Sequence, residues 1–192
     1  MAKDHTISRR EFIKVTSILG SGFAIGFNFL QAKKELNSQF SPNMYINVLS
    51  DDTVVLSVSK AEMGQGIWTS LPMLIAEEME ADWDKVKVKQ ISKDNFIGTG
   101  GSMSISGYGW EKMREAGAVA KQVLVESAAL KWKVSPVECV AKNSVVYHLK
   151  TSRSTSFGSL VDKASKVKIP KSVKLKKPSE FNLLGKDMLR TD

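Results

Sequence analysis

Apolar and polar residues alternate or recur at regular spacings beyond residue 42, and these patterns predict an order of strands and helices. Tyr45–Leu49 alternates, and the β-branched run Thr53–Ser59 follows the turn residues 50–52, so the two runs predict an antiparallel hairpin. Ile67–Ala81 then places apolar residues at positions 67, 68, 71, 74, 75 and 79, the spacing of one helix face. Pro72 falls in or near the first turn of this helix, where proline is tolerated.

The middle of the chain predicts a further strand and a long helix. Val86–Ile91 carries the strand pattern after an acidic stretch. A polar loop over residues 95–109 leads into the helix Tyr108–Trp132, whose apolar positions are 113, 116, 120, 123, 124, 127 and 128. Each predicted helix therefore follows directly on a glycine-containing loop.

The last predicted elements are a second hairpin and a short helix. Glu138–Ala141 and Ser144–Leu149 form the hairpin, and Ser156 is expected to cap a helix that ends at Ala164. The predicted fold is therefore α+β, with two β-hairpins, a central strand and two principal helices on one face of a sheet. The pattern does not fix the order of the strands, and no internal repeat is present.

Charge and cysteine content narrow the function classes. The chain carries 28 Lys and Arg against 20 Asp and Glu, and residues 150–192 supply most of the excess. No aromatic or arginine-rich recognition pattern accompanies these lysines, so they indicate a solvated surface and argue against a nucleic-acid-binding protein. Cys139 is the one cysteine, and His5 and His148 lie far apart in the sequence. A protein-ligated zinc or iron–sulfur site is not expected, and any metal would arrive inside a cofactor.

The N-terminus has the form of an export signal. Ser8, the pair Arg9-Arg10, Phe12 and Lys14 match the twin-arginine pattern, and the apolar segment 15–30 follows. We therefore predict export to the periplasm in a folded state; the alternative is an ordinary amphipathic N-terminal helix. No clear cleavage site follows, so removal of the signal and its retention as a membrane anchor both stay open.

The stretch from Ala61 to Thr69 is the most informative candidate site. Gly64 and Gly66 bracket Gln65 between a predicted strand and a predicted helix. Glycine permits close approach of the backbone to a bulky ligand, and the amide offers an acceptor and two donors. Such a turn can hold a large polar cofactor, although a plain strand-to-helix turn has the same spacing.

A second glycine-containing loop precedes the second helix. Gly100 and Gly101 permit close approach, and Ser102 and Ser104 add hydroxyl groups on either side of Met103. A helix N-terminus presents unpaired N–H groups and partial positive charge, which suits a phosphate. The alternative is a flexible surface loop with a serine cap. Two such loops in one small domain behind an export signal favour a phosphorylated cofactor.

Four segments resemble one family, in order and in spacing, over nearly the whole chain. They are the stretch Ala61–Glu78 with the following residues 81–83, the loop Thr99–Ser104, the helix segment Arg114–Ala118, and the closing stretch Leu184–Asp192. The chain resembles the molybdenum-binding subunit of the xanthine dehydrogenase/aldehyde oxidoreductase superfamily. Within that superfamily it is most similar to the exported, isoquinoline 1-oxidoreductase β-subunit-like branch.

The resemblance implies a molybdenum cofactor, expected as molybdopterin cytosine dinucleotide. It implies that the first turn contacts the pterin near molybdenum and that the second loop holds the phosphate and the dinucleotide end. The implied cofactor-binding residues are Met63, Gly64, Gln65, Gly66, Gly100, Gly101, Ser102, Met103 and Ser104. No residue is assigned as a catalytic group or as a direct metal ligand.

Part of the family pattern has no counterpart in these residues. The family's subunits are several times longer, and a glutamate near their C-terminus acts as the base. Nothing in the chain matches that motif, and Glu62 lies outside it. The resemblance therefore implies two partners: the C-terminal remainder of a large subunit, and a separate [2Fe–2S] subunit that receives electrons.

The resulting domain prediction has four parts. Residues 1–30 form a signal or anchor, residues 31–42 a linker, residues 43–164 the molybdopterin-binding segment, and residues 165–192 a basic connector to a further domain. The predicted function is cofactor binding within an exported molybdenum hydroxylase or dehydrogenase that oxidises an aldehyde or an N-heterocycle. The isolated chain is expected to be inactive, and the alternative is a truncated, non-catalytic exported module or remnant.

Overall fold

The principal sheet has four strands, and the first predicted hairpin forms its centre. The structure is a computed structural model that describes residues 22–26, 45–91 and 98–191. The strand order is β1-β2-β3-β5. Their bounds are Gly22–Gly26 for β1, Tyr45–Leu49 for β2, Val54–Val58 for β3 and Val86–Gln90 for β5. β2 pairs antiparallel with both β1 and β3, whereas β3 and β5 are parallel.

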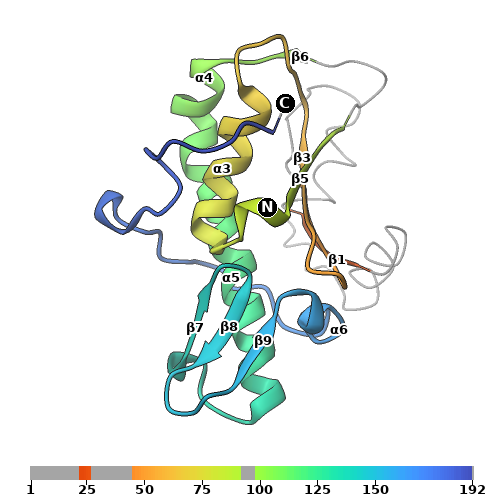
Figure 1. The fold of residues 1–192 in the computed structure, drawn as a ribbon, viewed down its shortest axis with the longest axis vertical. Coiled ribbons are helices and arrows are strands. Elements are labelled where there is room, and N and C mark those ends of the chain that lie inside the picture. The colour runs from red at the N-terminus through yellow and green to blue at the C-terminus, as the bar shows by residue number, and fades with distance from the viewer. Residues whose placement is uncertain (1–21, 27–44, 92–97, 192) are drawn as a thin grey trace, which may run out of the picture.

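Two long helices cover one side of this sheet, as the sequence predicts (Figure 1). They are α3, Ile67–Met79, and α5, Trp110–Trp132. All seven predicted apolar positions of α5 are buried, and so are those of α3 except Trp68, which is half-buried. The helices cross closely at Gly117, where an added Cβ would lie 2.2 Å from the carbonyl oxygen of Ile75. Glycine is therefore required there by a backbone-to-backbone approach and not by its own dihedral angles.

Pro72 lies deeper in α3 than predicted. The helix begins at Ile67, so Pro72 occupies its second turn and is buried. A proline in this position supplies no N–H group to the carbonyl one turn earlier, which belongs to Trp68. That carbonyl oxygen instead accepts a hydrogen bond of 2.7 Å from the hydroxyl of Thr191.

The second hairpin is also confirmed and gains a third strand. β7 (Cys139–Lys142), β8 (Val145–His148) and β9 (Ser154–Ser156) form an antiparallel sheet beside the C-terminal half of α5 (Figure 1). The predicted cap at Ser156 is wrong, because this residue ends β9 and its hydroxyl pairs with that of Ser159 at 3.0 Å. The short helix α6 spans only Val161–Ala164.

The short elements between these units are mostly single turns. They are β4 (Lys60–Ala61), β6 (Gly98–Thr99), α4 (Ser102–Ser104), the π-helical turn η2 (Ile105–Gly109), and the 3₁₀ turns η1 (Trp83–Lys85), η3 (Pro136–Glu138), η4 (Gly158–Leu160) and η5 (Pro178–Glu180). The loop predicted over residues 95–109 is thus helical from Ser102 onward, and residues 92–97 lie outside the described part.

The basic segment beyond residue 165 packs along the two helices without forming a long element of its own. It passes α5, and its end returns beside the N-terminal half of α3 (Figure 1). Within the described residues, no helix is both long enough and apolar enough to cross a membrane. The predicted export segment and the linker lie outside the described residues, apart from β1.

Candidate functional site

A two-stranded pairing brings the two glycine loops together. β4 and β6 are parallel, with Lys60 opposite Gly98 and Ala61 opposite Thr99. Each strand runs into a loop and then into a helix, β4 into α3 and β6 into α4 and α5. Because parallel strands end at the same edge, all nine residues predicted from the two loops lie in one region of the molecule.

The first loop is shaped by a carboxylate at the N-terminus of α3. Gly64 and Gly66 have φ of 93° and 78°, values that disfavour any side chain. One oxygen of Glu62 accepts from the N–H groups of Gly64 at 2.8 Å and Gly66 at 2.9 Å, and the other accepts from Trp68 at 2.9 Å. Glu62 thus satisfies donors that the sequence analysis left open for a ligand, and it complements the helix dipole.

Gln65 joins the first loop to the second. Its Nε2 donates to the carbonyl oxygen of Ala61 at 2.8 Å and to that of Gly100 at 2.7 Å. Its Oε1 accepts from the N–H of Met63 at 2.6 Å. Both amide hydrogens are therefore used inside the protein, and only the acceptor oxygen keeps capacity for a ligand.

The second loop has an open side and a packed side. Ser104 is buried, and a Cβ at Gly100 would lie 2.9 Å from its Oγ. A Cβ at Gly101 would meet nothing within 4 Å, and Ser102 is exposed. Met63 and Met103 are 66% and 86% exposed, so both loops present an apolar side chain to solvent. The open side therefore combines polar groups with apolar contacts, as a site for a large cofactor does.

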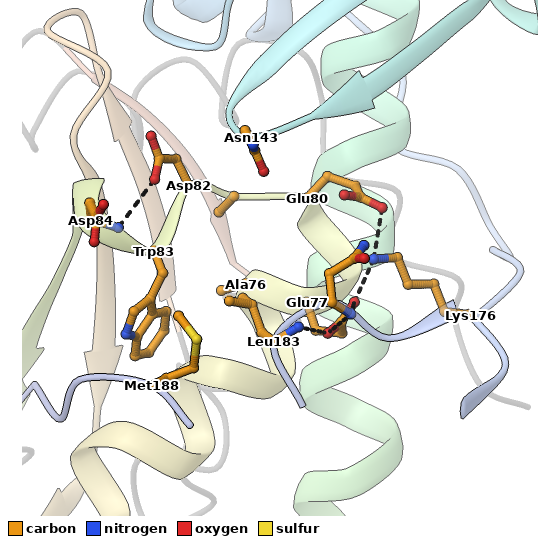
Figure 2. A pocket seen from close by; sticks show the side chains of 12 residues that line it. Ala76, Glu77, Glu80, Asp82, Trp83, Asp84, Asn143, Lys176, Leu183 and Met188 are labelled. Atoms are coloured by element: carbon orange, nitrogen blue, oxygen red, sulfur yellow. Dashed lines mark hydrogen bonds and ion pairs between the residues drawn. The ribbon is translucent and has the colours of Figure 1, made fainter. Parts of the chain in front are cut away.

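A separate pocket lies at the other end of α3, away from the predicted cofactor residues. Its volume is about 220 Å³, and Figure 2 shows it between α3, the β7–β8 turn and the segment after Lys176. Trp83, Met188 and the carboxylates of Glu77, Glu80 and Asp82 line it. Lys176 pairs with Glu77 at 2.5 Å and with Glu80 at 2.7 Å, and Asp82 accepts from the N–H of Asp84.

Glu77 is the most densely bonded carboxylate at this end of α3. It is 1% exposed and accepts from Lys176 Nζ and from three successive N–H groups, those of Asn182, Leu183 and Leu184. Burial raises the pKa of Glu77, but the bonds from Lys176 and the backbone outweigh it and leave the pKa lowered. Burial likewise opposes the charge on Lys176, yet its two carboxylate partners raise its pKa.

Glu78 forms a second buried ion pair on the neighbouring side of α3. Its Oε1 lies 2.8 Å from Nε and 2.7 Å from Nη2 of Arg114, and it also accepts from the N–H of Lys176. The guanidinium of Arg114 lies 5.0 Å from the ring centre of Trp110 and 5.1 Å from that of Phe181. Arg114 and Glu78 therefore connect α3, α5 and the C-terminal segment.

No role for these charged residues follows from the sequence, in which Glu77 and Glu78 only end the stretch Ala61–Glu78 that carries the resemblance. Glu77 and Glu78 follow a run of apolar residues in α3, and both are buried. Charged groups are rarely buried without partners, so adjacent carboxylates inside an apolar helix could have indicated basic or N–H partners. Which partners they have, at Lys176 and Arg114, depends on contacts distant in sequence.

The described part of the chain offers neither a protein-ligated metal site nor an accessible thiol. None of its groups of histidine, cysteine or carboxylate residues could hold a metal ion. Cys139 is buried, and burial followed by the nearby charge of Glu138 raises the pKa of its thiol. A less acidic, inaccessible thiol is a poor nucleophile.

Comparison with known proteins confirms the resemblance. The family model of the molybdopterin cofactor-binding domain matches residues 4–187. The isoquinoline 1-oxidoreductase subunit beta of Brevundimonas diminuta is 37% identical over an alignment of 142 positions, which covers 69% of this chain and 18% of that protein. The membrane-bound aldehyde dehydrogenase [pyrroloquinoline-quinone] of Gluconacetobacter polyoxogenes is 33% identical over an alignment of 206 positions, which covers 96% of this chain and 26% of that protein.

A solved structure supports the fold. Quinoline 2-oxidoreductase from Pseudomonas putida 86 is similar with a TM-score of 0.50 and 13% identity, over 79% of this chain and 21% of that one. The mixed α and β architecture predicted from sequence is thereby confirmed. The chain spans between about a fifth and a quarter of the length of these relatives. The family match over most of the chain carries the assignment: the chain belongs to the molybdopterin cofactor-binding domain family.

Proposed function

We propose that this chain forms one wall of the cofactor site in an exported molybdenum hydroxylase or dehydrogenase that oxidises an aldehyde or an N-heterocycle. The observation that carries the proposal is the parallel pairing of β4 with β6, which places the two glycine loops side by side in a member of the molybdopterin cofactor-binding domain family. The relatives whose names describe an oxidation of isoquinoline and of aldehydes support this reaction class.

The two loops fit different parts of the cofactor. The amide groups of the first turn are already bound to the Glu62 carboxylate, and a second anion there would meet like charge. The first turn therefore suits the uncharged pterin, with Met63 and the backbone of residues 64–66 in contact. The open side of the second loop, at Gly101, Ser102 and Met103, suits the phosphates of molybdopterin cytosine dinucleotide.

In this proposal the bound cofactor supplies the metal centre at which the substrate is oxidised. The residues of the chain bind and orient the cofactor. Gln65 fixes the spacing of the two loops through its bonds to Ala61 and Gly100. Met63 and Met103 cover apolar parts of the bound group and exclude water from it.

In this proposal the complete enzyme also contains a C-terminal remainder of the large subunit and a second subunit. Since the chain spans only part of its relatives, we place the catalytic base and the substrate pocket in a C-terminal remainder of the large subunit. A [2Fe–2S] subunit is the proposed electron acceptor. The pair Arg9-Arg10 is proposed to direct the assembled protein to the periplasm, with residues 15–30 as a removable signal or a membrane contact. Either use of this segment would take β1, Gly22–Gly26, out of the principal sheet.

The first experiment measures molybdenum and released cytosine nucleotide in a purified complex. The chain is produced together with a C-terminal remainder from the relative of Brevundimonas and its iron–sulfur partner. A Gly101→Asp variant places a carboxylate where the phosphate is proposed to lie, in space that is open in the protein. We expect bound molybdenum to fall at least about tenfold through repulsion between the two anions.

The matched control is Ser152→Asp, which introduces the same charge at an exposed residue between β8 and β9. Its molybdenum content should equal that of the unchanged complex. An assembled but metal-free parent complex, or equal metal content in both variants, would contradict the proposal. Replacing Arg9-Arg10 by two lysines tests export separately, since it should retain the protein in the cytoplasm without changing its metal content.

A further inference from the structure

The segment Lys176–Thr191, here named the strap, is bound to α3 at points along the whole helix. It begins at the carboxylates of Glu77 and Glu78 and ends beside Trp68 and Thr69, at the opposite end of the helix. In Figure 1 it crosses the front of α3 and finishes near the loop that leads into this helix. The strap therefore reaches from the pocket of Figure 2 to the first glycine loop.

The lower end of the strap wraps around a buried anion. The N–H groups of Asn182, Leu183 and Leu184 donate to one oxygen of Glu77 at 2.9, 2.6 and 3.0 Å. Successive N–H groups that converge in this way form a backbone nest for an anion. Here the anion is a side chain of the protein, so the nest fixes the path of the strap on the helix.

The pocket beneath the strap is a seam between the strap, α3 and the β7–β8 turn, and charged groups that line it are bonded to one another. Lys176 pairs with both Glu77 and Glu80. Within the described residues, the one side-chain polar atom that is buried without a partner is the amide oxygen of Asn47, which does not line the pocket. The indole N–H of Trp83 donates to the carbonyl oxygen of Leu189 at 3.0 Å and closes the seam toward the end of the strap.

The upper end of the strap completes the hydrogen bonding of α3. Pro72 leaves the carbonyl oxygen of Trp68 without its intrahelical donor, and the hydroxyl of Thr191 supplies one at 2.7 Å. The N–H of Thr191 also donates to Oγ1 of Thr69 at 3.1 Å. Thr191 thus binds the first turn of the helix at two neighbouring residues.

Trp68 links this contact to the glycine loop. Its N–H donates to Glu62, the carboxylate that also accepts from Gly64 and Gly66, and its indole N–H donates to the carbonyl oxygen of Lys60 at 2.8 Å. A displacement of the first helical turn would therefore move the anchor of the glycine turn directly.

We propose that the strap is a positioning element for the first glycine loop, with Glu77 as its anchor and Thr191 as the positioning residue. Thr191 holds the first turn of α3, that turn holds Glu62, and Glu62 holds Gly64 and Gly66 in their left-handed conformations. The inference rests on the proposed function only where it treats this loop as part of the cofactor site.

The test is amide hydrogen exchange in the full chain without cofactor, so its result is independent of the molybdenum measurement above. Thr191→Val removes the hydroxyl while keeping the shape of the side chain. We expect exchange at Gly64, Gly66 and Trp68 to become about tenfold faster, the effect of losing roughly one net hydrogen bond. Thr191→Ser keeps the hydroxyl and should restore slow exchange.

Two further variants separate positioning from a general loss of stability. Thr155→Val removes a comparable buried hydroxyl, bonded to Lys131 at 3.1 Å in the small sheet, and should leave the glycine loop unchanged. Pro72→Ala restores a donor for the Trp68 carbonyl, so adding Thr191→Val in that background should change exchange by only about twofold or less.

Three outcomes would overturn the proposal. One is unchanged exchange at Gly64 and Gly66 in Thr191→Val. Another is equal acceleration of these amides by Thr155→Val, which would mean that they report only global opening. The third is unprotected exchange of Leu183 and Leu184 in the unaltered chain, which would show that the strap is not bound at Glu77.

Discussion

Replacing Arg114 by methionine tests whether the buried ion pair holds α3, α5 and the strap together. Arg114 is 6% exposed and Glu78 0% exposed, and their contacts are 2.8 and 2.7 Å long. Nη2 of Arg114 also donates to the carbonyl oxygen of Lys176 at 2.5 Å. Methionine keeps most of the length of the side chain and removes the charge and all three bonds.

The expected destabilisation follows from the charge left behind. In Arg114→Met the carboxylate of Glu78 stays buried, and the N–H of Lys176 is its remaining donor among the described residues. Removing one partner of a buried pair costs about 3–5 kcal/mol. Since domains of this size are stable by roughly 5–15 kcal/mol in total, the variant should be close to unfolding.

The double variant Arg114→Met with Glu78→Gln separates the charge from the packing. A neutral amide still accepts from Lys176 and carries no uncompensated charge. We therefore expect the double variant to be about 1–3 kcal/mol more stable than Arg114→Met alone. This recovery would be the direct signature of a buried, desolvated pair.

The assay is urea unfolding followed by tryptophan fluorescence, with the midpoint and the slope fitted separately. The control is Arg153→Met, because Arg153 is exposed and its side chain donates only one long bond of 3.3 Å, to the Trp132 carbonyl. Its effect should be within about 0.5 kcal/mol. A loss below about 1 kcal/mol in Arg114→Met, or no recovery in the double variant, would refute the reasoning.

Three further results are expected from the same geometry. Gly117→Ala should destabilise the protein by roughly 1–3 kcal/mol in urea, because its Cβ would press on a backbone carbonyl, whereas Gly101→Ala should be nearly neutral. The lowered pKa of Glu77 means that its contribution to stability is present above about pH 4.5 and is lost as pH falls further, so strap amides should lose exchange protection in acid. Because the pKa of Lys176 is raised, its contribution to folding stability is fully present below pH 10.5. The exchange protection of the strap amides should therefore persist through neutral pH. Cys139 should react with a thiol reagent at least about tenfold more slowly in the native chain than in urea, and equal rates would contradict its burial.

Local patterns were sufficient for the two long helices and the two hairpins. The spacing of apolar residues predicts α3 and α5 to within a few residues, because a helix face repeats over a short stretch of chain. The hairpins β2–β3 and β7–β8 follow for the same reason, since short turns connect neighbouring runs. Ser156 shows the limit, because a serine favours both a cap and a strand end and the pairing of β9 with β8 decided between them.

The residues proposed for the candidate site come from the sequence, whereas the bonds among them come from the tertiary structure. The motifs identify both loops, but only the pairing of β4 with β6 brings Gln65 within 2.7 Å of the Gly100 carbonyl. The sequence of a Gly-Gln-Gly turn is the same whether the glutamine amide hydrogens bind a ligand or bind the protein. The role of Gln65 as a link between loops therefore depends on a contact 35 residues away in sequence.

The sequence by itself determined the family, the helices, the hairpins and the two glycine loops, because each of these depends on a short run of neighbouring residues. The tertiary structure alone decided the parallel pairing of β3 with β5, the partners of Glu77 and Glu78, and the course of the strap. These features join residues far apart in the chain. Which distant donor reaches a buried carboxylate is settled by how whole elements pack, since a charge removed from water must be matched by whatever that packing places beside it.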